Sequence, residues 1–156
     1  MVAHSSINHA GITGVGVTPA IASYKRTSAS YTTTSTTFVD VDGTNMALAI
    51  TTGARRVLVG FVGTVEQTVD GQLVDFDIDV DGTRVGGTNG LIRHRQYASN
   101  GGNTMAENAS FTFLTDALTA ASHTFKLQWK VSSGSGTIGG NSTSETCQFY
   151  VIEQGA

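Results

Sequence analysis

Residues 73–83 read Leu-Val-Asp-Phe-Asp-Ile-Asp-Val-Asp-Gly-Thr, and apolar and acidic side chains alternate along this stretch without a break. Successive side chains of a β-strand point to opposite faces, so a strand would gather the apolar residues on one face and the aspartates on the other. An α-helix would scatter both sets. The stretch therefore predicts a strand with its apolar face against a core and its aspartates facing water or a partner, closed by a turn at Asp81 and Gly82.

The chain on either side of this stretch is also strand-like. The apolar run at residues 57–65 predicts a central strand buried on both faces, in which Gly60 and Gly63 indicate a close backbone approach or a bulge. Further strands are expected at residues 23–30, 31–41, 46–51, 92–97, 109–114, 123–131 and 147–153, and a loop at residues 132–144. No long helical periodicity occurs. The predicted fold class is all-β, an antiparallel jelly-roll sandwich that forms a knob over residues 23–156.

Residues 1–22 differ from the rest of the chain in composition. Small apolar side chains are scattered there among glycine, serine and histidine, and such a segment cannot bury enough apolar surface to close a core. We expect an extended attachment arm that lies on another subunit. His4 and His9 could also chelate a metal across a symmetry axis, although hydrogen bonding is the more ordinary role. The arm residues expected to make the attachment are His4, Ile7, His9, Ile12, Val15 and Val17.

Composition and charge narrow the classes of partner. The 156 residues fit one domain with a sizeable core, and charged residues are only 13% of the chain. A formal net charge of -3 provides no basic footprint for nucleic acid or an anionic membrane. No apolar run reaches the roughly 20 residues of a membrane span, and the N-terminus lacks the regions of a signal peptide, so the chain is expected to be made in the cytoplasm. The single cysteine, Cys147, is expected to be a buried thiol.

Catalytic and metal-binding patterns are incomplete in this sequence. Residues 77–82 begin like a calcium-binding loop, but Thr88 stands where the closing glutamate belongs, and a strand would hold the aspartates in line. Paired aspartates could serve a glycosidase, yet the only tryptophan, Trp129, is expected in the core and not on the floor of a sugar cleft. Zinc, nucleophile-elbow, phosphate-loop and dinucleotide motifs do not occur. The sequence predicts no enzyme, no cofactor and no bound metal.

The aspartates of residues 73–83 are expected to form a surface carboxylate row. Like charges side by side on a strand need cations nearby. We therefore expect structural ion pairs with arginines of a neighbouring strand or subunit. The row is Asp75, Asp77, Asp79 and Asp81, and the candidate partners are Arg55, Arg56, Arg84, Arg93 and Arg95.

A resemblance to a known family rests on three stretches. They are residues 31–44 (Tyr-Thr-Thr-Thr-Ser-Thr-Thr-Phe-Val-Asp-Val-Asp-Gly-Thr), 76–87 (Phe-Asp-Ile-Asp-Val-Asp-Gly-Thr-Arg-Val-Gly-Gly) and 118–130 (Leu-Thr-Ala-Ala-Ser-His-Thr-Phe-Lys-Leu-Gln-Trp-Lys). The chain resembles tailed-bacteriophage virion proteins of the capsid decoration, head-fibre or tail-fibre-tip type, with a jelly-roll knob like that of the tumour-necrosis-factor family. The resemblance covers residues 24–153. It implies a homotrimer on the virion surface, docked by its N-terminal segment on the major capsid protein or another virion subunit.

Within that resemblance the trimer interface and the role remain open to alternatives. Tyr24, Phe149 and Tyr150 are expected to bury aromatic surface around the trimer axis. A short arm before a compact knob favours a capsid decoration protein over the receptor-binding tip of a tail fibre or spike, which usually follows a long shaft. Loops at residues 86–90, 98–103 and 132–144 could still bind a host glycan. A carbohydrate-binding module is a further alternative.

Overall fold

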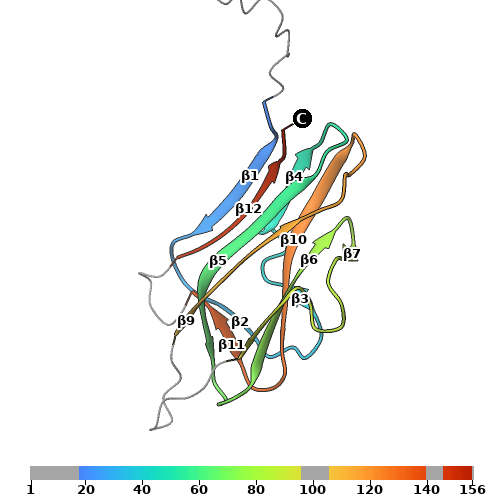
Figure 1. Cartoon of the computed structure of the whole chain (residues 1–156). Coiled ribbons are helices and arrows are strands. Elements are labelled where there is room, and N and C mark those ends of the chain that lie inside the picture. Colours follow the sequence, from blue (N-terminus) through green and yellow to red (C-terminus); the bar gives the residue numbers. More distant parts are fainter. Residues whose placement is uncertain (1–17, 96–105, 140–145, 156) are drawn as a thin grey trace, which may run out of the picture.

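Two antiparallel sheets pack face to face in the computed structural model, which describes residues 18–95, 106–139 and 146–155 (Figure 1). Each sheet contains six strands, and the elements within the described residues are all strands. Sheet I comprises β1 (Ile21–Arg26), β2 (Tyr31–Thr33), β5 (Val57–Gln67), β9 (Glu107–Leu114), β11 (Gly136–Ile138) and β12 (Cys147–Glu153). Sheet II comprises β3 (Val39–Asp40), β4 (Ala47–Thr51), β6 (Leu73–Val80), β7 (Thr83–Arg84), β8 (Ile92–Arg95) and β10 (Ser122–Val131).

The longest strands form the centre of each sheet. In sheet I, β5 lies between β9 on one side and β12 and β11 on the other, while β1 and β2 pair with β12 and β11. In sheet II, β6 and β10 pair with each other, β3 and β4 border β10, and β7 and β8 border β6. The prediction of an all-β antiparallel sandwich is confirmed. The jelly-roll connection of the strands stays a prediction.

The core lies between the sheets and is built by the period-two alternation of the strands. Phe76 on β6 and Trp129 on β10 are 0% and 1% exposed, as the alternation predicts. Phe76 stacks on Phe61 of β5 with ring centroids 5.4 Å apart and on Trp129 at 6.4 Å, so aromatic contacts join the two sheets. Full burial of such side chains stabilises the fold by about 1.5–3 kcal/mol each.

The region predicted as one strand at residues 31–41 is interrupted. The chain leaves sheet I after β2 and joins sheet II at β3, and the amide of Val131 donates to the carbonyl of Ser35 in the crossing segment at 2.8 Å. Alternation of side chains along the sequence does not reveal such a change of sheet. The expected boundary of the arm also differs from the start of the body, because Ile21 and Ala22 already pair with β12.

The loop predicted at residues 132–144 contains a strand. Gly136 opens β11, which pairs with both β2 and β5. A Cβ at Gly136 would lie 2.7 Å from Cγ1 of Val131, so only glycine allows this close approach. A short strand that begins with glycine in a Ser/Gly-rich stretch gives little local signal, and its pairing is decided by the partners.

The central strand β5 is confirmed in position and only partly in burial. Gly60 lies beneath the ring of Tyr150, and Gly63 lies against Cys147 and Phe61, so both glycines mark close approaches. The expected burial on both faces is wrong at Val62, which is 46% exposed on the outer face of sheet I. The strand is therefore covered fully only on its core side.

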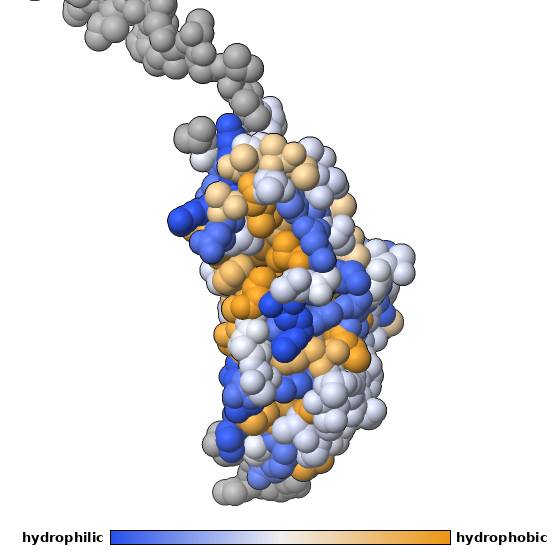
Figure 2. All heavy atoms as spheres, turned by 90° about the vertical axis from the view of Figure 1, so that its right-hand side faces the viewer, coloured by the Kyte–Doolittle hydropathy of each residue, from blue (hydrophilic) through white to orange (hydrophobic). Residues whose placement is uncertain are grey.

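Apolar side chains also reach the surface elsewhere. Figure 2, which views the molecule from the right-hand side of Figure 1, shows hydrophobic residues in a broken strip between hydrophilic ones. No helix within the described residues is long and apolar enough to cross a lipid bilayer.

Candidate functional site

The aspartates of β6 lie on the outer face of sheet II but are not exposed. Asp75, Asp77 and Asp79 are 3%, 0% and 6% exposed, so the expectation of a surface row is wrong for them. The reason is tertiary, because loops of the same chain fold over this face. Asp81 differs, since it lies in the turn after β6 with its side chain 47% exposed. Asp81 and Gly82 have φ values of 53° and 86°, which confirms the predicted tight turn.

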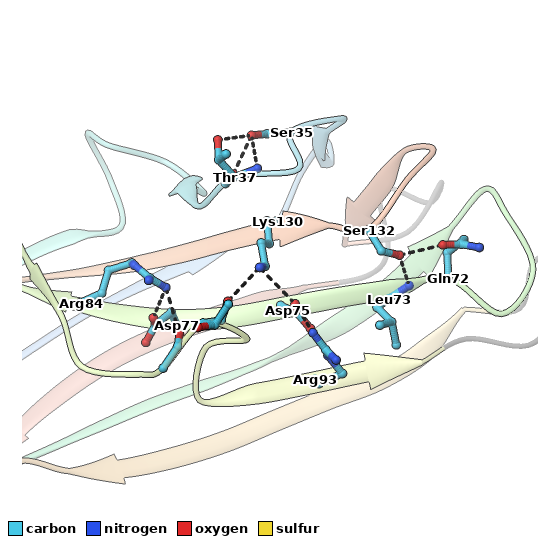
Figure 3. A network of polar contacts seen from close by, with 12 residues as sticks. Ser35, Thr37, Gln72, Leu73, Asp75, Asp77, Arg84, Arg93, Lys130 and Ser132 are labelled. Carbon is cyan, nitrogen blue, oxygen red and sulfur yellow. Dashed lines mark hydrogen bonds and ion pairs between the residues drawn. The ribbon is translucent and has the colours of Figure 1, made fainter.

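Asp75 is neutralised from both neighbouring strands (Figure 3). Arg93 lies opposite Asp75 on β8 and donates to both carboxylate oxygens, at 2.8 and 3.0 Å. Lys130 lies opposite Asp75 on β10, with its Nζ 3.6 Å from Oδ2. The hydrogen bond to Asp75 raises the pKa of Arg93. The carboxylate of Asp75 is thus paired with a bidentate arginine and a second cation.

Asp77 is held by one arginine and by backbone amides. Arg84 Nη1 donates to Oδ2 at 2.8 Å, and the amides of Gly86 and Ile78 donate to Oδ1 at 2.9 and 2.8 Å. Residues 85–91 fold back over β6, and a Cβ at Gly86 would lie 2.6 Å from the carbonyl carbon of Gly90. The prediction that Arg84 and Arg93 pair with the row is confirmed. In the part of the chain that the structure describes, the other candidate arginines form no ion pair with it.

Phe38 completes the cover of this charged face. Its ring lies 4.2 Å from the guanidinium carbon of Arg84 and 4.8 Å from Nζ of Lys130, which are cation–π distances. Lys130 also donates to the carbonyl of Thr88 at 2.9 Å. A shallow hollow of about 410 Å³ remains beside the ring, lined by Thr36, Thr37, Phe38, Arg84, Thr88 and Lys130.

Asp75 and Asp77 accept hydrogen bonds from fixed cations or amides, so their geometry is that of structural ion pairs. Among the described residues, no group of three or more histidine, cysteine, aspartate or glutamate side chains is placed to hold a metal ion. In the calcium-like stretch, Asp77 pairs with Arg84 of the neighbouring strand β7. Cys147 is a buried thiol, as predicted. Burial raises the pKa of this thiol to about 11.

One arrangement of side chains resembles a catalytic triad: His123, Asp81 and Thr119. His123 Nδ1 lies 2.6 Å from Asp81 Oδ2, and Nε2 lies 3.3 Å from the Thr119 hydroxyl and 3.0 Å from its carbonyl oxygen. A carbonyl oxygen only accepts, so Nε2 carries a proton, and the hydrogen bond to Asp81 raises the pKa of His123. A histidine that donates from Nε2 cannot take a proton from the Thr119 hydroxyl as a base. Its hydrogen bonds instead connect Thr119 with the turn that carries Asp81.

The outer face of sheet I is different in kind, because a row of aliphatic side chains crosses it. Ile21 pairs with Ile152, Ile152 with Leu58 and Leu58 with Leu114, so one side chain from each of β1, β12, β5 and β9 stands side by side. Ile21 is 63% exposed and Leu114 is 44% exposed. We call these residues the apolar row. The sequence did not reveal the apolar row, because each of its residues, taken alone, is an ordinary apolar residue near the end of a strand.

The predicted trimer-interface residues fall on different faces. Phe149 is 0% exposed and points into the core, so its assignment to the interface is wrong. Tyr24 pairs with Phe149 across β1 and β12 and packs against the same core. Tyr150 alone points outward, where its ring lies over Gly60 beside the apolar row.

The predicted arm residues lie outside the described residues, as does the loop at residues 98–103. These arm residues are His4, Ile7, His9, Ile12, Val15 and Val17.

Beside the apolar row, the side chain of Glu153 ties the residue before β1 to the rest of the sandwich. Its carboxylate accepts from the amide of Gly53 at 2.6 Å and from the amide of Ala20 at 3.3 Å. These hydrogen bonds lower the pKa of Glu153. The bond from Ala20 also holds that residue in place directly before β1.

Comparison with known proteins leaves the family open. No protein-family model and no curated protein sequence matches the chain. The dimeric latent PorU of Porphyromonas gingivalis is similar with a TM-score of 0.42 and 7% identity, over 88% of this chain and 13% of that protein. VP2 from a subviral particle of infectious bursal disease virus is similar with a TM-score of 0.39 and 15% identity, over 88% and 37% of the two chains.

A structure of T=1 particles derived from infectious bursal virus gives a TM-score of 0.42 and 13% identity, over 88% of this chain and 36% of that chain. This chain thus spans much less than half the length of the proteins that it resembles. Similarity at this level assigns it neither a family nor a function.

Proposed function

We propose that this chain is a non-enzymatic structural protein of a virion surface, a homotrimeric capsid decoration protein made in the host cytoplasm. Residues 1–22 would dock it on the major capsid protein or another virion subunit. The observation that carries the assembly part is the apolar row on the outer face of sheet I. The sequence resemblance to tailed-bacteriophage virion proteins supports the location.

The apolar row has the properties of a surface that meets another protein. Aliphatic side chains from neighbouring strands form a continuous strip, and contiguous exposed apolar surface on a soluble domain marks an interaction site. Burial of apolar surface contributes roughly 25 cal/mol per Å². Within the strands, the charged residues of this face, Lys25 and Glu66, lie away from the row. Arg56, directly before β5, is the exposed charged residue nearest to Leu58 in the chain.

The position of the row supports a link between assembly and attachment. Ile21 is the first residue of β1, and Glu153 holds the preceding residue Ala20 in place. A contact between copies at this row would bring the first residues of the bodies together at one end of the oligomer. Segments that leave from one end can reach a common particle surface, as a decoration protein requires.

The test of assembly compares matched aspartate substitutions. We expect the wild-type chain to have the mass of a trimer by size-exclusion chromatography with light scattering. Leu114→Asp places a charge in the apolar row and is expected to give monomers with unchanged circular dichroism. Val69→Asp is the control, since Val69 has a similar exposed fraction, 41%, but lies outside the row in the turn between β5 and β6. A monomeric wild type, or a Leu114→Asp trimer, would refute the assembly proposal.

The location is tested separately by the copy number of the chain in purified virions. Gel densitometry showing a copy number comparable with that of the major capsid protein supports decoration. A copy number far below it supports the alternative, the tip of a tail fibre or spike. Absence of the chain from purified particles would contradict both, whatever its oligomeric state.

A further inference from the structure

The hollow beside Phe38 is built from positive charge and hydroxyl groups. Its volume of about 410 Å³ lies within the range of small-molecule sites, roughly 300–1,000 Å³. Arg84 and Lys130 supply cationic groups, and Thr36, Thr37 and Thr88 supply hydroxyls at its lining. A lining of this kind offers hydrogen bonds to an anionic, hydroxylated ligand more than to an apolar one.

The charges beneath the hollow lie in close pairs. Asp75 and Asp77 are paired with Arg84, Arg93 and Lys130. Asp79, which lies opposite Arg84 on β7, is a third carboxylate of this face. Arg93 satisfies Asp75 through both oxygens, so Lys130, at 3.6 Å, is its weaker partner. Of the two cations that line the hollow, Lys130 is therefore held less closely by a carboxylate than Arg84 is.

Arg84 retains donors that the fold does not use. Its Nη1 donates to Asp77 at 2.8 Å and to the carbonyl of Gly87 at 3.4 Å, while Nε and Nη2 have no hydrogen-bond partner among the described residues. The side chain is 34% exposed. A planar guanidinium with free donors matches the geometry of a carboxylate better than a lysine does.

Phe38 holds both cations in place. Its ring lies within cation–π distance of Arg84 and Lys130, and the crossing segment that carries it is tied to β10 by the hydrogen bond from Val131 to Ser35. Ser35 in turn bonds to the carbonyl of Thr37 at 2.6 Å. The apolar ring excludes water from one side of the cations, which strengthens their attraction for an anion.

We propose that this hollow binds the carboxylate of an acidic saccharide residue. Arg84 and Lys130 hold the carboxylate, and the hydroxyls of Thr36, Thr37 and Thr88 bond to the sugar hydroxyls. The volume fits a single sugar ring, and the open, shallow form suits one residue of a longer chain. The site lies on sheet II, so it depends neither on the apolar row nor on the trimer.

The test is a titration of backbone amide chemical shifts by NMR at constant ionic strength. The probes are sodium D-glucuronate, D-glucose, which lacks the carboxylate, and sodium acetate, which lacks the ring. Glucuronate is expected to give saturable shifts at Phe38, Arg84 and Thr88 with a Kd of about 1 mM. Glucose and acetate are expected to bind at least about tenfold more weakly.

Substitutions on β10 supply the matched control. Lys130→Gln removes a cation of the hollow but leaves Asp75 paired with Arg93, and it is expected to weaken glucuronate binding about tenfold. Lys126→Gln removes a cation of the same outer face that pairs with Asp40 and does not line the hollow, and it is expected to change nothing. Thr88→Val tests a hydroxyl without touching the ion pairs.

Several results would overturn the proposal. Glucose binding as well as glucuronate would remove the role of the cations, and acetate binding as well as glucuronate would reduce the hollow to a general anion site. Absence of saturable shifts at the pocket amides, or equal weakening by Lys126→Gln and Lys130→Gln, would also reject it. If Lys130→Gln unfolds, unchanged glucuronate binding by folded Thr88→Val rejects the saccharide assignment.

Discussion

The two outer faces of the sandwich enclose one core but differ in charge and in how far the chain covers them. The outer face of sheet II is charged, and the chain covers it with its own residues 85–91 and with Phe38. The outer face of sheet I is largely uncharged, and within the described residues the two ends of its apolar row, Ile21 and Leu114, are exposed. The chain thus completes the charged face by itself, and the apolar row is the surface that we propose for assembly.

Physical chemistry explains this division. Buried charges are tolerated only with partners in fixed positions, because an unpaired buried carboxylate costs several kcal/mol. Such partners are most reliably supplied by the same chain, as Arg84 and Gly86 are for Asp77. Apolar association is not directional and tolerates a partner that arrives later. Substitutions on the two faces should therefore act on different quantities, stability for sheet II and assembly for sheet I.

The largest expected effect is the loss of the cation that pairs with Asp77. Arg84→Ala leaves a fully buried carboxylate with amide donors only, and we expect the free energy of unfolding to fall by about 3 kcal/mol. Urea denaturation followed by tryptophan fluorescence measures it. Arg95→Ala is the control, because Arg95 is exposed on β8 and is expected to cost less than about 0.5 kcal/mol. Equal losses in both variants would contradict the buried ion pair.

Glycine substitutions sharpen the comparison of covered and uncovered faces. Gly86→Ala forces a Cβ against the backbone of Gly90 and Leu91, which cannot yield, and is expected to cost about 2 kcal/mol. Gly60→Ala meets only the outer end of Tyr150, whose ring can swing away, and is expected to cost less than about 1 kcal/mol. At Gly87 a Cβ meets nothing within 4 Å.

Thermal melts of these three variants provide the measurement. Gly87→Ala should melt like the wild type, Gly60→Ala slightly lower and Gly86→Ala lowest. If Gly60→Ala were as damaging as Gly86→Ala, the outer face of sheet I would be packed as rigidly as that of sheet II. The contrast between the faces would then be lost.

The smallest effect is a pH dependence at one end of sheet II. The pKa of His123 is raised above its ordinary 6.5 by Asp81, so this pair stabilises the fold below pH 6.5 and loses its contribution as pH rises through the folded pKa of His123. The pKa of Asp81 is lowered below 3.8, with desolvation opposing the hydrogen bonds from Thr124 and His123. The contribution is therefore also lost as pH falls through that folded pKa.

Solvent screening limits the size of this effect. Asp81 is 47% exposed, so the pair is expected to contribute less than about 1 kcal/mol between pH 3.8 and 6.5. Stability should decline from pH 6 to pH 9 in the wild type, and His123→Gln should flatten this decline while leaving Leu114 and the apolar row unchanged. An equally steep decline in His123→Gln would assign it to other groups.

The sequence alone predicted the strands that have a clear local signature. The alternation of residues 73–83 and 123–131 identified β6 and β10, their inward residues such as Phe76 and Trp129, and the turn at Asp81. It also predicted that cations would pair with the aspartates. Period-two alternation is a property of the strand itself, so it can be recognised in the sequence without knowing which strands pair with it.

Only the tertiary structure decided what covers each outer face. The sequence placed Phe149 at an interface and Asp77 at the surface, and both are fully buried. It gave no sign that Ile21, Ile152, Leu58 and Leu114 would stand in one row, because those residues are far apart in the chain and meet through strand register. A strand's pattern tells which residues share a face, but exposure depends on the distant segments that fold over that face or leave it open.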